Sequence, residues 1–94
     1  MAKIKWTNNA RTEYHALLRF AKNSSQKQAE EIRLQLNVLL KKVQIFNRIC
    51  PSHPKLPEFR RCVFNKNFIV VYDLSDNEIT LISVFDARSA HPLN

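Results

Sequence analysis

The fold is decided by the last third of the chain, which reads Leu56-Pro-Glu-Phe-Arg-Arg-Cys-Val-Phe-Asn-Lys-Asn-Phe-Ile-Val-Val-Tyr-Asp-Leu-Ser-Asp-Asn-Glu-Ile-Thr-Leu-Ile-Ser-Val-Phe-Asp-Ala-Arg88. Three apolar-rich runs, at about 59–64, 67–73 and 78–85, are separated by short polar stretches. Such runs joined by tight polar turns predict three antiparallel strands. Arginines stand at the start of the first strand and just after the last, so the margin of this sheet is a candidate site for an anionic ligand.

The turns of this sheet are built without glycine, because the chain contains none. Positions of positive φ in residues 65–67 and 75–78 are therefore expected to fall to Asn or Asp, which tolerate that conformation best. The same absence excludes glycine-rich phosphate loops, and with them the P-loop and Rossmann functions.

Alternation along the strands predicts the two faces of the sheet. Phe68, Val70 and Tyr72 share one face of the central strand, and Ile69 and Val71 share the other. Both faces carry apolar residues, so we expect helices to cover one side and something else to cover the other side in part, which leaves a half-exposed apolar face as a possible binding surface. In the last strand the expected faces are Ile79, Leu81, Ser83 and Phe85 on one side and Thr80, Ile82 and Val84 on the other.

Upstream of the sheet, the pattern predicts one short strand and two helices. Residues 3–6 alternate in polarity as a strand does, and Asn23-Ser24-Ser25 ends the first helix and caps the second. The prolines in 47–57 make that segment a non-helical connector. The apolar stripe of the first helix is Tyr14, Leu17, Leu18 and Ala21, and that of the second is Ala29, Ile32, Leu36, Leu39, Leu40, Val43 and Phe46.

These elements make one domain, residues 1–94, since 94 residues suffice for a single core. The expected class is α+β, in the order β-α-α-β-β-β, with a two-helix hairpin packed on a small, mostly antiparallel sheet. The seam of the second helix fits an antiparallel pair with the first helix, and a dimer is the alternative.

The net charge of +7 is unevenly distributed. Residues 1–57 hold 11 basic and 3 acidic side chains, for +8, and residues 58–94 hold 4 and 5, for −1. A field of that sign attracts nucleic acid or an acidic protein. The alternative is a solvated basic surface with no particular partner.

The two cysteines do not constitute a disulfide framework, and residues 1–6 lack the apolar stretch that export requires. No apolar run is long enough for a membrane span. We therefore expect a reducing, cytoplasmic location, with Cys62 an ordinary strand residue. Cys50 and His53 form a C-x-x-H pair that Cys62 and His91 would have to complete, but the spacing matches no common zinc pattern, so no metal or cofactor is expected.

Three stretches, residues 4–10, 68–72 and 84–92, together resemble the RelE/ParE family of bacterial toxins, and the resemblance spans nearly the whole chain. They read Ile4-Lys-Trp-Thr-Asn-Asn-Ala10, Phe68-Ile-Val-Val-Tyr72 and Val84-Phe-Asp-Ala-Arg-Ser-Ala-His-Pro92. The resemblance implies the toxin of a type II toxin–antitoxin pair, of the kind that inhibits growth and stabilises plasmids. It also implies a small acidic antitoxin as partner.

The family contains two activities, and the chain departs from one of them. RelE-like members are metal-independent, ribosome-dependent mRNA endonucleases, and for such an activity the resemblance implies Arg60, Arg88 and His91 as catalytic residues. Cys62 stands where a second basic residue is expected, Ile69 where those nucleases place an arginine, and their C-terminal tyrosine is missing. ParE-like members are inhibitors of DNA gyrase with an apolar central strand, which residues 68–72 resemble more closely.

The sequence therefore predicts a non-enzymatic, ParE-like topoisomerase inhibitor. The alternatives are a RelE-like mRNA endonuclease and a basic nucleic-acid-binding module without toxicity. The residues expected to bind the target are Arg60, Arg61, Lys66 and Arg88, and those expected to bind the antitoxin are Arg19, Arg33, Lys41 and Lys42.

Overall fold

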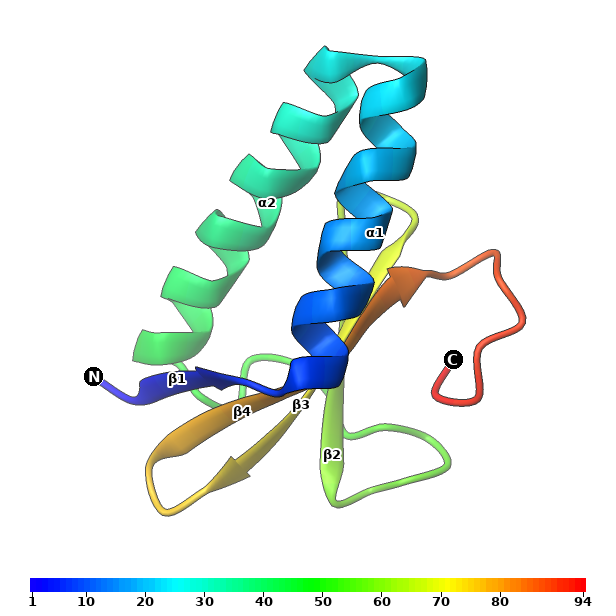
Figure 1. Ribbon diagram of the computed structural model, residues 1–94. Helices are drawn as coiled ribbons and strands as arrows, with labels where there is room; N and C mark the ends of the chain where they lie inside the picture. The colour runs from blue at the N-terminus through cyan, green and yellow to red at the C-terminus, as the bar shows by residue number, and fades with distance from the viewer.

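The computed structural model describes all residues from 1 to 94, and its elements follow the predicted order (Figure 1). The two helices form a hairpin that stands over one face of the sheet, which confirms the α+β class. Neither helix is long and apolar enough to cross a bilayer. The elements are β1 (Lys3–Trp6), α1 (Asn8–Ser24), α2 (Gln26–Ile45), β2 (Phe59–Phe64), β3 (Phe68–Ser75) and β4 (Glu78–Asp86).

The four strands form one sheet in the order β1-β4-β3-β2. The pairs β2–β3 and β3–β4 are antiparallel, whereas β1 runs parallel to β4. Strand β1, near the start of the chain, thus pairs with β4, near its end. Strands β1 and β2 form the two edges of the sheet.

The helical hairpin is closed by a single residue. The backbone N–H of Ser25 donates to the Ala21 carbonyl at the end of α1, and its hydroxyl accepts from the Gln28 N–H at the start of α2. One serine therefore terminates the first helix and caps the second, as the sequence predicted. Thr7 caps the start of α1 by accepting from the Ala10 N–H.

The core lies between the hairpin and the sheet. Ile32, Leu36 and Val43 of α2 are fully buried, together with Val70 and Tyr72 of β3. The seam predicted for the second helix is confirmed over these positions, but its last member is wrong. Phe46 is 62 % exposed because α2 ends at Ile45 and the backbone of Phe46 leaves the helical region.

An irregularity in β4 changes which residues face the core. Tyr72 pairs with Leu81 and Val71 pairs with Ser83, so Ile82 has no partner on β3. This is a β-bulge, and it shifts the alternation by one residue.

Beyond the bulge, the predicted faces of the last strand are therefore wrong. Val84 belongs to the core beneath the helices, and Phe85 lies with the apolar residues of the opposite face. The carbonyl of Ile82 accepts from the side chains of Thr7 and Asn9, so the start of α1 is bound to the bulge.

The face of the sheet opposite the helices is covered in part by the C-terminal segment, residues 87–94. Ile69, Val71 and Phe85 form a second, smaller apolar cluster, and Leu93 packs against it. The second face is thus partly covered, as expected, and the structure identifies the C-terminal segment as its cover.

The turns use four residues of positive φ, of which three are Asn or Asp, as predicted. The fourth is Lys66, with φ of 71°, so the prediction is wrong at that position. The β2–β3 turn requires positive φ at two consecutive residues, and Asn65 supplies only the first.

Cys50 and Cys62 are joined by a disulfide, which corrects the expectation that Cys62 is an ordinary strand residue. Ser52 pairs with Arg60 in an antiparallel bridge, so the proline-rich segment runs along the outer edge of β2. In that register Cys50 lies opposite Cys62, and their Cα atoms are 5.2 Å apart. The same segment covers part of an edge that would otherwise be open to pairing with another chain.

Candidate functional site

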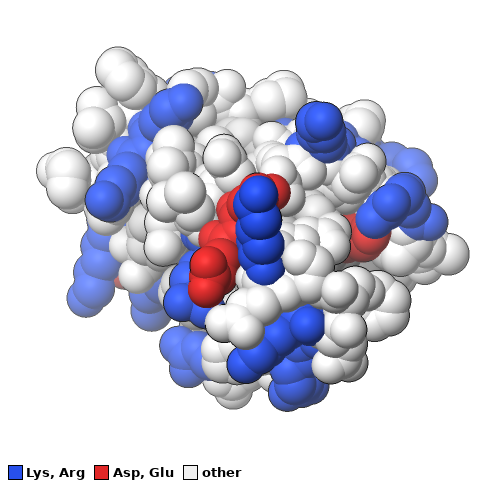
Figure 2. Space-filling view, turned by 90° about the horizontal axis from the view of Figure 1, so that it is seen from above, with Lys and Arg blue, Asp and Glu red and all other residues white.

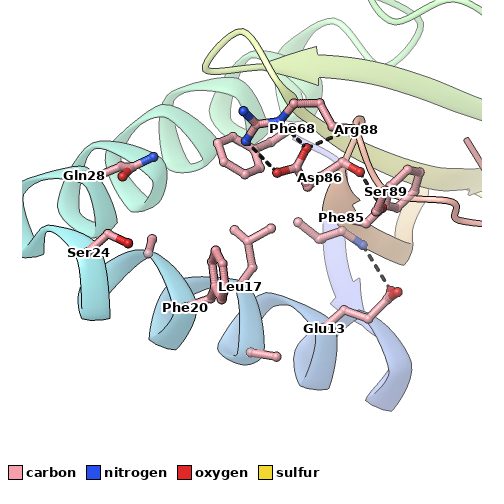
Figure 3. Close-up of a pocket in the computed structure, with 13 residues that line it drawn as sticks. Glu13, Leu17, Phe20, Ser24, Gln28, Phe68, Phe85, Asp86, Arg88 and Ser89 are labelled. Atoms are coloured by element: carbon pink, nitrogen blue, oxygen red, sulfur yellow. Dashed lines mark hydrogen bonds and ion pairs between the residues drawn. The ribbon is translucent and has the colours of Figure 1, made fainter.

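A groove of about 470 Å³ lies between α1, the start of β3, the end of β4 and the start of the C-terminal segment. Leu17 and Phe20 of α1 point into it from one side, and Asp86 and Arg88 form the opposite rim (Figure 3). Phe20 is 79 % exposed although it is a large apolar side chain. An apolar hollow with charged groups at its rim is typical of a binding site.

The rim of this groove carries a two-pronged ion pair. The Arg88 guanidinium donates through Nη2 to Oδ2 of Asp86 at 2.7 Å and through Nε to Oδ1 at 3.0 Å. These hydrogen bonds hold the pKa of the Asp86 carboxyl below its ordinary value and raise the pKa of Arg88. The Arg88 side chain is 66 % exposed, so its outer face is free to meet a ligand.

We expect the Asp86 pKa to rise toward its ordinary value when Arg88 is replaced by alanine. Because the pKa of Asp86 is lowered in the folded state, the ion pair stabilises the fold above the ordinary carboxyl pKa, and this contribution is lost as the pH falls through the folded-state value. The stability effect is small since the pair lies in solvent. NMR titration of the Asp86 side chain between pH 2 and 6 measures it, and an unchanged titration curve would contradict the ion pair.

Glu13 of α1, which also lines the groove, accepts four hydrogen bonds. The donors are the Asn9 side-chain amide at 3.1 Å, the Ser83 hydroxyl, the Val84 N–H at 3.3 Å, and Nε2 of His91 at 2.6 Å. Ser83 is fully buried, and the bulge in β4 places it there. Glu13 therefore joins α1, β4 and the C-terminal segment.

Both ring nitrogens of His91 are occupied. Nδ1 accepts from the Leu93 N–H at 3.0 Å, so the proton sits on Nε2 and is donated to Glu13. The ring stacks on Phe85, with centroids 3.9 Å apart. His91 thus fixes the C-terminal segment against the sheet.

Ser83, His91 and Glu13 do not have the geometry of a nucleophilic triad. In such a triad the serine and the acid bond to opposite ring nitrogens. Here both oxygens lie at Nε2 of His91, and Nδ1 accepts from the backbone. The arrangement can hold the segment in place, but His91 cannot accept a proton from the serine.

Arg60 is directed away from this groove. Its Nη1 donates to the carbonyls of Cys50 at 2.6 Å and Arg48 at 3.4 Å, beside Tyr72, whose hydroxyl donates to the Asn47 carbonyl at 2.8 Å. Burial raises the pKa of the Tyr72 phenol. Arg60 therefore fastens the segment that follows α2.

Arg61 and Lys66 lie apart from Arg60. Nη2 of Arg61 donates to Oδ1 of Asn94 at 2.9 Å, on the opposite side of β2 from Arg60. Lys66 is exposed in the β2–β3 turn. The structure thus places only Arg88 at the groove.

The residues of the C-x-x-H pair and its proposed partners do not converge. Nε2 of His53 donates to the Leu93 carbonyl at 2.6 Å, its Nδ1 accepts from the Lys55 and Leu56 N–H groups, and the two cysteines bind each other. No group of three or more His, Cys, Asp or Glu side chains is placed to hold a metal ion.

The sequence model of a family described as the ParE toxin of the type II toxin–antitoxin system, parDE, matches residues 4–90. The chain belongs to the ParE toxin family. It is therefore the toxin component of a type II toxin–antitoxin system, which confirms the resemblance and does not favour the RelE-like alternative.

Two solved structures share the fold of this ParE-family chain. A structure titled "Chromosomal ParDE TA system from P. aeruginosa" has a TM-score of 0.74 at 16% identity, covering 94% of this chain and 98% of the other. The solution structure of the conserved hypothetical protein HP0894 from Helicobacter pylori has a TM-score of 0.53 at 17% identity, covering 97% and 100%. No curated protein matches the chain in sequence.

Sequence reasoning about this ParE-family toxin missed Glu13 and Ser83. A signal was available, because Glu13 is the one acidic residue before Glu30 and Ser83 interrupts an apolar strand. What joins them is the bulge, which nothing in the local pattern marks.

The cations predicted to meet the antitoxin are all exposed on the helical hairpin. Figure 2 shows basic side chains spread over the upper face, at its centre as well as along its outline, and acidic ones in few places. These cations are Arg19 of α1 and Arg33, Lys41 and Lys42 of α2.

Proposed function

We propose that this toxin inhibits DNA gyrase by binding to it, without catalysis, and that a small acidic antitoxin neutralises it in the cytoplasm. Membership in the ParE family supports the toxin role. The inhibitory surface is the groove with Arg88 at its rim, because this cation is exposed beside an apolar hollow.

The observation that carries the proposal is that two candidate catalytic side chains, His91 and Arg60, are hydrogen-bonded within the protein. Metal-independent RNA cleavage needs a group that moves a proton and cations around the scissile phosphate. His91 has both ring nitrogens bonded within the chain, and Arg60 binds backbone carbonyls away from the groove. This supports inhibition by binding over mRNA cleavage.

The antitoxin part of the proposal has two supports. The related P. aeruginosa structure is titled as a ParDE toxin–antitoxin system, and residues 1–57 of this chain carry a charge of +8 (11 − 3) that attracts an acidic partner. Arg19, Arg33, Lys41 and Lys42 are the proposed contacts, since all four are exposed.

We expect induction of the chain alone to stop DNA synthesis before protein synthesis, and the purified protein to inhibit gyrase supercoiling. Arg88→Ala should weaken inhibition by about 10-fold, the effect expected when an arginine that contacts the target beside an apolar hollow is removed. Pulse labelling through the first minutes and a supercoiling assay measure both effects. Arg11→Ala, an exposed arginine elsewhere on α1, is the matched control.

The other outcomes are informative. Early collapse of protein synthesis would indicate mRNA cleavage and would make Arg60, Arg88 and His91 the residues to test. No effect on either synthesis, together with salt-sensitive binding to DNA or RNA, would indicate a basic nucleic-acid-binding module.

A further inference from the structure

Helix α2 is apolar on two opposite sides. Its inner side is buried, whereas Leu34, Val38 and Ile45 are 59%, 40% and 61% exposed. At 3.6 residues per turn these three positions fall within about 40° of one another, and roughly opposite the buried seam. A helix with a single partner needs only one apolar side.

The exposed side continues past the end of the helix. Phe46 and Ile49 are 62 % and 50 % exposed. We call Leu34, Val38, Ile45, Phe46 and Ile49 the outer stripe. It holds 5 of the 8 large apolar residues that are exposed on the molecule, within 16 residues of the chain (34–49). Single exposed apolar residues need no explanation, but a gathering of this kind indicates an interaction surface.

The end of the outer stripe is held rigidly. The Asn47 side-chain amide donates to the Val43 carbonyl at 2.6 Å, and the Asn47 carbonyl accepts from the Tyr72 hydroxyl. Arg60 and the Cys50–Cys62 disulfide fix the residues that follow. Phe46 and Ile49 are thus presented in a fixed position, which lowers the entropic cost of binding.

The charge around the outer stripe selects the partner. Residues 32–57 contain five basic residues and no acidic residue, for a local charge of +5 (5 − 0). Glu30 and Glu31 lie one turn before Leu34, so the positive charge gathers toward the end of the stripe that carries Lys41, Lys42 and Arg48. A partner with acidic side chains beside apolar ones is complementary.

The spacing indicates that the partner presents a helix. Leu34, Val38, Lys41 and Ile45 follow one another at intervals of 4, 3 and 4 residues, which is the seam of two packed helices. A second copy of the chain is a poor occupant. Two α2 helices packed antiparallel would bring the two copies of Lys41 together near the two-fold axis, where like charges repel.

We propose that the outer stripe of α2 is the docking site for an acidic amphipathic helix of a partner protein. This inference rests on the proposed function, in which the partner is a small acidic antitoxin. The surface is separate from the groove at Arg88, since none of its residues lines that groove.

The test uses the full chain and a designed helical peptide of about 21 residues, three heptads, with leucine at the seam and glutamate on the flanks. A second peptide has the same seam with lysine in place of glutamate. Fluorescence anisotropy at low and high salt measures binding. We expect the acidic peptide to bind at least about 10-fold more tightly than the lysine peptide and to weaken with salt.

Variants locate the contact. Ile45→Gln should weaken binding of the acidic peptide by about 10-fold. Val63→Gln, at a similarly exposed apolar position on β2, should weaken this binding by less than about 2-fold. Lys41→Glu should weaken it more than Lys27→Glu, which lies about 21 Å away along the helix. Thermal unfolding of each variant verifies that the fold is kept.

Three results would overturn the proposal: equal binding of the two peptides, equal effects of Ile45→Gln and Val63→Gln, or no binding. Dimerisation of the chain in sedimentation that Ile45→Gln abolishes would also overturn it, because the stripe would then belong to a second copy. The assay uses purified protein and no gyrase. Its failure is therefore distinguishable from failure of the inhibition assay.

Discussion

Replacing Glu13 by alanine should lower the free energy of unfolding by about 3 kcal/mol, the scale of losing hydrogen bonds to a partly buried charged group. The variant leaves the Ser83 hydroxyl buried without its acceptor, and it removes the partner of His91. The C-terminal segment should then detach from the sheet, because His91 is one of its attachment points.

Glu13→Gln is the matched variant, since its amide oxygen can still accept a hydrogen bond. We expect Glu13→Gln to lower the free energy of unfolding by about half as much as Glu13→Ala, because a neutral acceptor forms weaker hydrogen bonds than a carboxylate. Glu30→Ala, at an exposed position of α2, controls for the loss of a helix glutamate.

Two measurements follow these variants. Urea unfolding gives the change in stability, and amide hydrogen exchange of Leu93 and Asn94 reports on the C-terminal segment. Both amides donate within that segment, to Nδ1 and to the carbonyl of His91. Unchanged exchange in Glu13→Ala would show that the segment is held by other contacts.

Reducing the Cys50–Cys62 disulfide should lower stability by about 3 kcal/mol, the chain-entropy value for a closed loop of this size. The two cysteines are 12 residues apart in the sequence and are 1% and 9% exposed. The fold should persist after reduction, because Arg60 and the backbone pairing of the 51–53 segment with β2 remain.

This effect is measured by unfolding with and without a thiol reductant, using Cys50→Ser/Cys62→Ser as the control. The double variant should be insensitive to the reductant. If wild type in the oxidised state were no more stable than when reduced, the disulfide would contribute nothing. In the proposed cytoplasmic setting the reduced form would prevail, and trapping of free thiols in cells would measure its share.

The elements that local patterns predicted are those whose signals lie in neighbouring residues. The alternation in β3 marks both of its faces, and the seam of α2 marks its buried side from Ala29 to Val43. Ser25 closes the helical hairpin through bonds to residues within four positions of itself. Each of these depends on backbone geometry that a few residues set for themselves.

The candidate site was predicted only in part. Of the arginines predicted at the margin of the sheet, Arg88 lies at the groove. Arg60 instead binds the carbonyls of residues 48 and 50, and Arg61 binds Asn94. Their partners come from the connector and the C-terminal segment, whose paths carry no periodic signal.

The sequence by itself determined the order of the elements, the faces of β3 and the uneven charge, because alternation, helical spacing and ionisable groups are local properties. The tertiary structure alone decided the bulge at Ile82, the Cys50–Cys62 pair and the meeting of Glu13 with His91. These features join residues that are far apart in the chain or in different strands. Their geometry depends on how the packed layers bring those residues together, so no stretch of sequence encodes it alone.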